Sequence, residues 1–440
     1  SSPLFFFPPP LSLFVIMSSD LARRKLVEAA EESLSAFSTA TESAPPPLTW
    51  LPSLSSHSLT RLLSALSTPT STAASSFLSI ALSIAPVASK LATPDHAPFF
   101  TALQTVITNR KVTEALLARA ASVLVGLASA ATERPSDSLN ELTSSYFLTI
   151  LLKARTQDVS KACMNNLCDA LYKVKAILAQ VPTDAHDDIV ATLTMDKVLL
   201  APSGTGRRLA AYAFATMGSP FVSKVHEAMV TSYWMPTGVS AATHKAVAEV
   251  YFRGWRLARG TADAESKEME RLEVEYRLEH GEDSDMPELL APGSDPASAT
   301  ATLNVMEKHL QEAVECAVHC AEEQAVGASK LILDFFAANR RAAGVDGLLE
   351  AMYAPILWRA LAAANPTVRL QAATVLARAF PVVDTDAPPA DRASALQQNF
   401  DAMHDLLKDE APLVRMAGIR LVGRALVNFS ELLPASTVKS

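Results

Sequence analysis

The stretches PTVRLQAATVLARAF (residues 366–380) and PLVRMAGIRLVGRAL (residues 412–426) repeat one design. Each begins with a Pro-x-Val-Arg pattern, and the two beginnings lie 46 residues apart. The repeated positions are Pro366, Val368 and Arg369 in the first stretch and Pro412, Val414 and Arg415 in the second. A match over such a long offset indicates a repeated structural unit.

Each stretch predicts an amphipathic helix. In the first, Ala372, Val375 and Ala379 recur at helical spacing, whereas the arginines lie mostly off that stripe. The proline stands at the first helical position, where the backbone N–H would have no partner within the helix. Residues 348–364 and 396–408 predict further helices that precede the two stretches.

A helix pair that recurs about every 40–47 residues is typical of HEAT repeats. One pair cannot bury its apolar face alone, so neighbouring pairs stack into a superhelix. We therefore predict an all-α fold of the HEAT/armadillo type, an α-solenoid of antiparallel helix pairs. Arg369 and Arg415 are expected to be structural and to join neighbouring repeats. The alternative is two unrelated amphipathic helices.

The composition favours an all-helical chain. Apolar residues make up 49%, which is ordinary for a globular protein, while glycine is scarce at 14 of 440 residues. Folds of strands and tight turns, like phosphate-binding loops, need more glycine. The net charge of −8 gives no bulk attraction to nucleic acid but allows a local basic face. Four cysteines are too few for a disulfide framework and fit a reducing compartment.

The first residues, SSPLFFFPPPLSLFVIM, are apolar, but no basic region precedes them and three prolines interrupt them. We expect residues 1–19 to be disordered or an artefact of the gene model, with a targeting signal as the alternative. We find no apolar run of the roughly 18 residues that a membrane span requires, so no membrane partner is expected.

Shifts in composition divide the chain into five parts. After residues 1–19, residues 20–135 are expected to form atypical helices with Ser/Pro-rich loops, and residues 136–260 to form helical repeats. Residues 261–300 contain a charged run and then several prolines, which predict a charged helix followed by a linker. Residues 301–440 carry the HEAT-type repeats and are expected to be truncated at their C-terminal end.

No group of residues predicts catalysis. Residues 203–208, SGTGRR, lack the glycine spacing and the Lys-Ser/Thr pair of a phosphate loop, so they indicate a helix N-cap. Cys316, His319 and Cys320 lie within about one helical turn, but a zinc site needs four ligands and buried cysteines are the simpler interpretation. The histidines form no pairing typical of nucleophilic catalysis. We therefore expect no enzyme, catalytic site, metal, cofactor or small-molecule substrate.

Basic residues gather in one window of the sequence. The candidate DNA contacts are Arg207, Arg208, Lys224, Arg253, Arg256 and Arg259. The last three recur every third residue and therefore stay near one another on a helix. One hypothesis is a strip that meets phosphates. The alternative is a solvated face in which Glu249 pairs with Arg253 while the neighbouring aromatic residues pack in the core.

Four strings resemble a known family. They are GRRLAAYAF (residues 206–214), AEVYFRGWRLARG (248–260), YAPILWR (353–359) and NPTVRLQAATVLARAFPVVD (365–384). In their order they resemble the HEAT-repeat G subunit of condensin II, a non-SMC subunit of plants and animals. The resemblance covers roughly residues 200–430, and before residue 200 only the helical character is similar.

The resemblance implies a scaffold and not an enzyme. Members of this family bind the kleisin subunit of a ring complex, whose ATPase activity belongs to the SMC partners. With the kleisin, the solenoid engages DNA, and the complex compacts mitotic chromosomes in the nucleus. An extended kleisin segment is expected along the concave groove, where it touches successive repeats. The family is also linked to methylated histone tails, although the few dispersed aromatic residues here show no methyl-lysine cage.

This chain departs from the family in length, because family members are far longer. We therefore expect a truncated gene model or a fragment. A different class of protein remains as an alternative function, namely a general HEAT-repeat adaptor such as an importin-like transport carrier. Such a carrier would bind localisation peptides and not DNA.

Overall fold

The computed structural model describes residues 112–133, 137–236, 238–280, 298–320 and 328–429, with positions 78, 81, 100, 103, 104 and 106–108 before them. The predictions for residues 1–19, for most of residues 20–135 and for the linker after residue 280 therefore lie outside the described residues. The chain divides into two compact units, Ser1–Val181 and Pro182–Ser440.

The first unit is helical wherever it is described, apart from its turns. Its elements are α5 (Glu114–Glu133), α6 (Asp137–Thr156), α7 (Lys161–Lys173) and the short helix η4 (Lys175–Gln180). Helix α5 packs against α6 and α7, and it buries Leu117, Leu124 and Leu127 completely. Ser160 caps α7, because its hydroxyl accepts a hydrogen bond from the Cys163 N–H at 3.2 Å.

By length and composition alone, α5 could cross a membrane over Glu114–Thr132. The sequence-based expectation that no run reaches that length is therefore wrong for this helix. The helix is apolar enough to cross a membrane because it is rich in alanine, valine and leucine. The segment contains only two charged residues, Glu114 and Arg119. A single helix of this kind is weak evidence, since the core helix of a soluble protein has the same composition.

The second unit begins with short elements and continues with long helices. The short elements are η5 (Thr183–Ala185), α8 (His186–Leu193), α9 (Asp196–Leu199) and the π-helix η6 (Val230–Trp234). The longer helices are α10 (Thr205–Thr216), α11 (Ser219–Met229), α12 (Ala241–His280), α13 (Ala299–His319), α15 (Ala328–Ala338), α16 (Val345–Leu361), α17 (Pro366–Ala379), α18 (Pro389–Leu407) and α19 (Pro412–Asn428).

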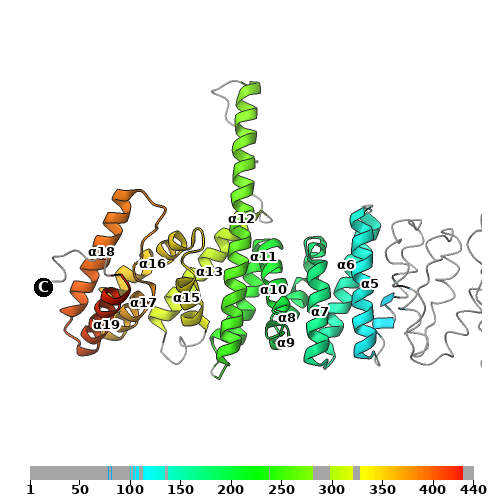
Figure 1. The fold of residues 1–440 in the computed structure, drawn as a ribbon, viewed down its shortest axis with the longest axis horizontal. Helices are drawn as coiled ribbons and strands as arrows, with labels where there is room; N and C mark the ends of the chain where they lie inside the picture. The colour runs from blue at the N-terminus through cyan, green and yellow to red at the C-terminus, as the bar shows by residue number, and fades with distance from the viewer. Residues whose placement is uncertain are drawn as a thin grey trace, which may run out of the picture. The chain divides into compact units, whose positions relative to one another are not determined.

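These helices form two layers (Figure 1). In one layer α10, α12, α15, α17 and α19 pack side by side in that order, and in the other α11, α13, α16 and α18 do the same. Consecutive helices such as α16 and α17, or α18 and α19, join the layers as pairs. No strand occurs among the residues described. The all-α solenoid is thus confirmed, and the assignment of its repeats to the HEAT type stays a prediction.

The repeat signature marks equivalent turns in the structure. Prolines begin both α17 and α19, as predicted. Arg369 donates to the carbonyl oxygens of Ala363 and Ala364 at 2.7 and 3.0 Å. Arg415 makes the same contacts one repeat later, to Asp409 and Glu410 at 2.8 and 3.0 Å. The two arginines therefore tie each helix to the turn that precedes it.

Aromatic side chains fill the interface between the middle helices. Trp255 and Tyr251 of α12 are fully buried, and their rings meet Phe336 of α15 and Phe214 of α10 edge to face. Gly254 of α12 faces Phe214 of α10. A Cβ atom at position 254 would stand 2.7 Å from the Phe214 ring. The absence of a side chain thus lets α10 and α12 approach closely.

Helix α12 is longer than the sequence indicated. It continues without interruption to His280, so the division predicted between residues 260 and 261 falls inside one helix. In Figure 1 the C-terminal half of α12 projects beyond its neighbours. The five-part division of the chain otherwise stays a prediction. Residues 203–208 begin α10 with Gly204 as the N-cap residue, as the helix-cap interpretation predicted.

Candidate functional site

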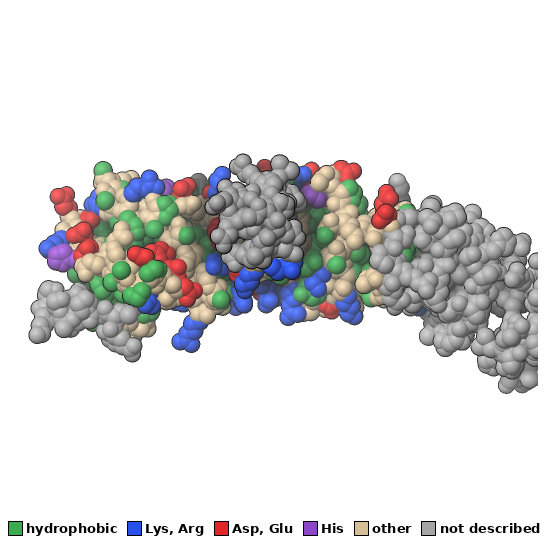
Figure 2. Space-filling view, turned by 90° about the horizontal axis from the view of Figure 1, so that it is seen from above, with side chains coloured by type: hydrophobic (Ala, Val, Ile, Leu, Met, Phe, Trp, Pro, Cys, Tyr) green, Lys and Arg blue, Asp and Glu red, His purple; other side chains and the backbone are tan. Residues whose placement is uncertain are grey.

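The predicted basic residues lie mainly on two neighbouring helices. Arg207 and Arg208 belong to α10, and Arg253, Arg256 and Arg259 belong to α12, in the same layer. Figure 2 shows Lys and Arg side chains gathered beside the base of the central projection. The tertiary structure therefore brings together five of the six candidates, which we call the basic strip.

Glu249 neutralises part of the basic strip. Its carboxylate accepts from the Nε atoms of Arg207 and Arg253, both at 2.7 Å. The pairing with Arg253 is the i,i+4 contact of the solvated-face interpretation, whereas the pairing with Arg207 joins α10 to α12. Arg207 also donates to the Leu199 carbonyl at 2.8 Å. The side chain of Arg207 is thus engaged in contacts within the fold, to Glu249 and to the Leu199 carbonyl.

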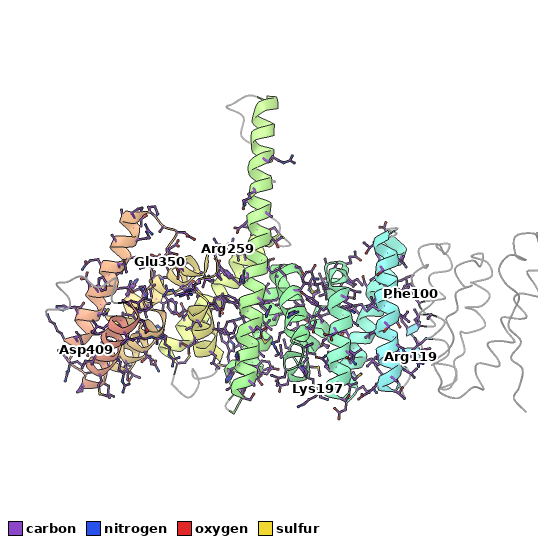
Figure 3. All side chains as sticks on the ribbon, in the orientation of Figure 1. Phe100, Arg119, Lys197, Arg259, Glu350 and Asp409 are labelled. Atoms are coloured by element: carbon purple, nitrogen blue, oxygen red, sulfur yellow. The ribbon has the colours of Figure 1, made fainter. Side chains whose placement is uncertain are left out.

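The other arginines of the basic strip are more accessible. Arg256 and Arg259 lie over the rings of Phe252 and Trp255, at 5.9 and 5.7 Å from the ring centroids. Figure 3 places Arg259 beside α12 near the point where the helix leaves its neighbours. Arg208 is exposed, and its side chain makes no ion pair with any residue that the structure describes.

Lys224 does not belong to the basic strip. It lies on α11, in the other layer, and pairs with Asp187 of α8 at 2.6 Å. Sequence proximity suggested one group because α10, α11 and α12 follow one another along the chain. The layered packing separates them, since α11 turns back across the stack.

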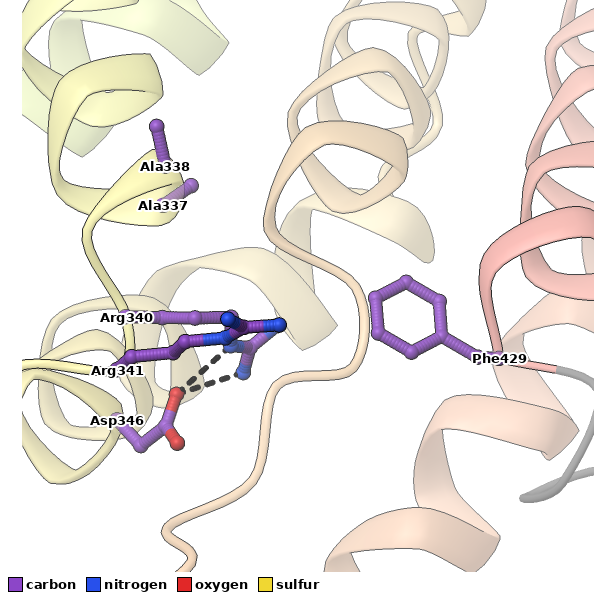
Figure 4. A pocket seen from close by; sticks show the side chains of 6 residues that line it. All are labelled: Ala337, Ala338, Arg340, Arg341, Asp346 and Phe429. Atoms are coloured by element: carbon purple, nitrogen blue, oxygen red, sulfur yellow. Dashed lines mark hydrogen bonds and ion pairs between the residues drawn. The ribbon is translucent and has the colours of Figure 1, made fainter.

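A second basic region, which sequence reasoning missed, lies where α15, α17 and α19 end. Two adjoining cavities of about 530 and 510 Å³ share Ala337, Ala338, Arg340 and Phe429 in their walls. We call the two cavities together the end groove. Figure 4 shows Arg340 and Arg341 pointing into the space that Phe429 faces from the other side. The only signal in the sequence was the match between Arg378 and Arg424, one repeat apart.

Ion pairs and backbone contacts fix the walls of the end groove. Arg340 pairs with Asp346 at 2.8 Å and donates to the carbonyl oxygens of Phe380 and Pro381 at 3.2 and 2.8 Å. Arg378 of α17 pairs with Asp334 of α15 at 3.0 Å. Cations are favourable here because each helix presents the negative end of its dipole.

The repeat arginine Arg369 also reaches the following repeat. Its Nε and Nη2 atoms donate to the two oxygens of Asp409 at 2.6 and 2.9 Å. This forked pairing lowers the pKa of Asp409, mainly through the hydrogen bond from Arg369. Asp409 also accepts from the Ala411 N–H at 2.8 Å, at the beginning of α19. The contact links consecutive helix pairs as the structural interpretation of Arg369 proposed.

One group of side chains could in principle hold a metal ion. His226 of α11 and His309 and Glu312 of α13 bring three ligand atoms within 4.8 Å of one another. However, the imidazole rings are stacked, 3.9 Å apart and inclined by only 13°. A metal ion binds in the plane of an imidazole, and one ion cannot lie in two stacked planes. The rings as placed do not fit a metal.

The same group is a hydrogen-bonded network. Glu312 Oε2 lies 3.2 Å from His226 Nε2 and 3.3 Å from His309 Nδ1, while His226 Nδ1 lies 2.7 Å from the Tyr251 hydroxyl. Burial, together with the neighbouring His309, lowers the pKa of His226 to about 4. The network therefore holds a neutral His226 between three helices. No sequence spacing could reveal it, because His226 and Glu312 are far apart in the chain.

Burial raises the pKa of three of the four cysteine thiols, those of Cys163, Cys168 and Cys316. Cys163 and Cys168 are buried, and burial raises the pKa of the Cys168 thiol to about 12. Cys316 and Cys320 are half-buried at the end of α13, with their sulfur atoms 3.5 Å apart. Burial, with a smaller contribution from Cys320, raises the pKa of Cys316 to about 12. A thiol with so high a pKa is a poor nucleophile and a poor metal ligand.

Comparison with known proteins finds one family that is similar to part of this chain. The family described as "Condensin II non structural maintenance of chromosomes subunit" matches residues 295–384, which extend from α13 through α17 to the following turn. The condensin-2 complex G2 subunit of Danio rerio is 28% identical over 234 residues, or 53% of this chain and 17% of the relative. The Mus musculus protein is 24% identical over 52% of this chain and 16% of its own length.

The Homo sapiens G2 subunit is 37% identical over 91 residues, or 21% of this chain and 8% of the relative. The matched part thus spans less than a fifth of the length of each of these relatives. The fold defines a helical-repeat protein that displays side chains from successive helices on one layer. The matches confirm the resemblance to the HEAT-repeat G subunit of condensin II, and the chain is related to this family of non-SMC subunits.

Proposed function

We propose that this chain is part of a non-catalytic scaffold subunit of condensin II, which binds a kleisin and chromatin to promote mitotic chromosome condensation in the nucleus. The family match and the named relatives support membership in the complex. The kleisin and the SMC ATPases are the proposed protein partners. The proposed role without catalysis rests on the similarity to non-SMC condensin II subunits.

The observation that carries the proposal is the continuous layer of α10, α12, α15, α17 and α19. In such a stack, neighbouring helices offer side chains in a row, which suits long partners such as a duplex or an extended peptide. The basic strip lies at α10 and α12 of this layer. Because the whole chain carries a net charge of −8, a local basic strip is the place where phosphates can bind.

Co-purification tests the proposed complex. The full-length gene product is tagged and recovered from mitotic cells, and its partners are identified by mass spectrometry. Recovery of a kleisin and two SMC ATPases supports the proposal. Recovery of a small GTPase and transport cargo without these proteins would instead favour the importin-like adaptor.

DNA binding is tested on the accessible arginines of the basic strip. We expect the variant R208Q/R253Q/R256Q/R259Q to bind duplex DNA more weakly and with a flatter dependence on salt, because fewer counterions are released. Each phosphate that the variant no longer neutralises should reduce the slope of log K against log salt by about 0.9. Lys224→Gln is the matched control, since Lys224 lies on the other layer. An unchanged slope in the quadruple variant would place the DNA-binding surface elsewhere.

A further inference from the structure

The end groove crosses three consecutive helices of one layer. Asp334 and Ala337 come from α15, Arg378 from α17, and Arg424 and Asn428 from α19. Neighbouring helix axes lie about 8–10 Å apart, so the groove spans roughly 20 Å, the length of about six extended residues. Its length and its direction across the helices therefore suit a short extended peptide.

The charges of the end groove do not balance. Arg340 is paired with Asp346, and Arg378 is paired with Asp334. Two further arginines, Arg341 and Arg424, are exposed at the groove. Neither makes an ion pair with a residue in the described part of the chain. The groove thus has two positive charges in excess, although the chain as a whole is acidic.

The internal repeat shows that Arg424 lacks the carboxylate that its counterpart Arg378 has among the described residues. Arg378 and Arg424 occupy matching positions 46 residues apart. Arg378 finds its carboxylate in Asp334, which precedes it by 44 residues. The residue 44 positions before Arg424 is Phe380, which has no charge. Among the described residues, the ion pair that joins α15 to α17 therefore has no counterpart between α17 and α19, and Arg424 has no carboxylate partner there.

Apolar side chains line the groove between the arginines. Phe429 and Phe380 meet edge to face with their ring centroids 5.6 Å apart, and Ala337 and Ala338 form the opposite wall. Phe429 is only half-buried, so part of its ring faces the cavity. The end groove therefore combines a hydrophobic surface with unpaired guanidinium groups on either side of it.

We propose that the end groove is a docking site for an acidic, extended peptide segment of a partner protein. Carboxylates of the peptide pair with Arg341 and Arg424, since the planar guanidinium binds a carboxylate through two parallel hydrogen bonds. An apolar side chain of the peptide covers Phe429. The apolar lining of Ala337, Ala338 and Phe429 favours a peptide over a DNA duplex, whose sugar-phosphate backbone offers no apolar side chain to cover it. This inference rests on the proposed function only in expecting the peptide to belong to a condensin partner.

The test uses a fluorescein-labelled synthetic peptide of roughly ten residues in which glutamates alternate with leucine and glycine. Binding to the complete chain is followed by fluorescence anisotropy at low salt. We expect R341E/R424E to raise the Kd at least about tenfold, because both attractive pairs become repulsive. Lys408→Glu is the control for one charge reversal, and the single variants R341E and R424E are each compared with it. Lys408 follows α18 near the beginning of α19, whereas Arg424 lies in the last turns of α19.

Three results would overturn the inference: no binding of the glutamate peptide, equal binding of a peptide with glutamine in place of glutamate, or an unchanged Kd in R341E/R424E. If the peptide does not bind, but a DNA duplex binds to the wild type and not to R341E/R424E, the groove would be assigned to DNA. Circular dichroism checks that the variants are folded. If the peptide fails while kleisin and SMC proteins still co-purify, only the docking site is refuted. If the peptide binds and these proteins are absent, the proposed function is refuted.

Discussion

Asn399 holds the segment that separates α17 from α18. Its side chain is fully buried, and its Oδ1 accepts from the Val382 N–H at 3.0 Å. Its Nδ2 donates to the carbonyl oxygens of Val382 and Ala395 at 3.0 and 2.7 Å. Val382 is only 1% exposed, so water cannot replace the asparagine. This amide therefore satisfies both backbone groups of one buried residue between α17 and α18.

We predict that Asn399→Ala lowers the free energy of unfolding by about 2–6 kcal/mol. The substitution leaves the N–H and the C=O of Val382 buried without partners, and each unpaired group costs about 1–3 kcal/mol. The Ala395 carbonyl oxygen loses only the hydrogen bond from Asn399 Nδ2, and this carbonyl group adds little to the cost because it lies within α18. The loss should appear as a lower urea midpoint with an unchanged m-value.

Hydrogen exchange of the complete chain locates the effect. The Val382 amide should exchange faster in Asn399→Ala, while amides of α10 keep their protection. Gln397→Ala is the matched control, because Gln397 is exposed on the same helix and bonds only to Asp401. A loss below about 0.5 kcal/mol, or no change in exchange at Val382, would refute the reasoning. Either result would mean that water or a backbone shift satisfies the two groups.

The two remaining predictions concern the packing of α10 and the network at His226. Gly206→Ala should destabilise the fold by about 1–3 kcal/mol or more, because the new Cβ would stand 2.1 Å from the Val198 carbonyl oxygen. Gly260→Ala, where a Cβ meets nothing within 4 Å, is the control, and equal melting temperatures for the two variants would contradict the prediction. Since the pKa of His226 is lowered in the fold, its stabilising effect is present above pH 6.5 and is lost as the pH falls towards about 4. The loss of stability amounts to about 3 kcal/mol at most. The difference in urea midpoint between wild type and His226→Gln should therefore change between pH 6.5 and about 4. A difference that stays constant over this pH range would contradict the prediction.

Local signals in the sequence were sufficient for the fold class. The Pro-x-Val-Arg repeat placed α17 and α19 correctly, because helix starts depend on residues close to one another in the chain. The scarcity of glycine, and the helical spacing of the apolar residues, favoured helices over a sheet, and these signals are also local in the sequence. The family resemblance also needed only short strings, and the comparisons confirm it. The continuation of α12 past residue 260 was not predicted, because the change to a charged composition suggested a boundary there.

Which side chains meet across helices could not be read from the sequence, whereas the contact of Glu249 with Arg253 within one helix could. Packing in two layers moved Lys224 away from the basic strip and joined Arg207 to Arg253 through Glu249. It also brought His226 to His309 and assembled the end groove from residues of three helices. The reason is physical: local propensity fixes each helix, but contacts between helices depend on how their ridges fit together over the whole stack. The sequence alone therefore determined a helical-repeat chain and its relatives, while the tertiary structure alone decided which of its charges are already paired and which remain available for partners.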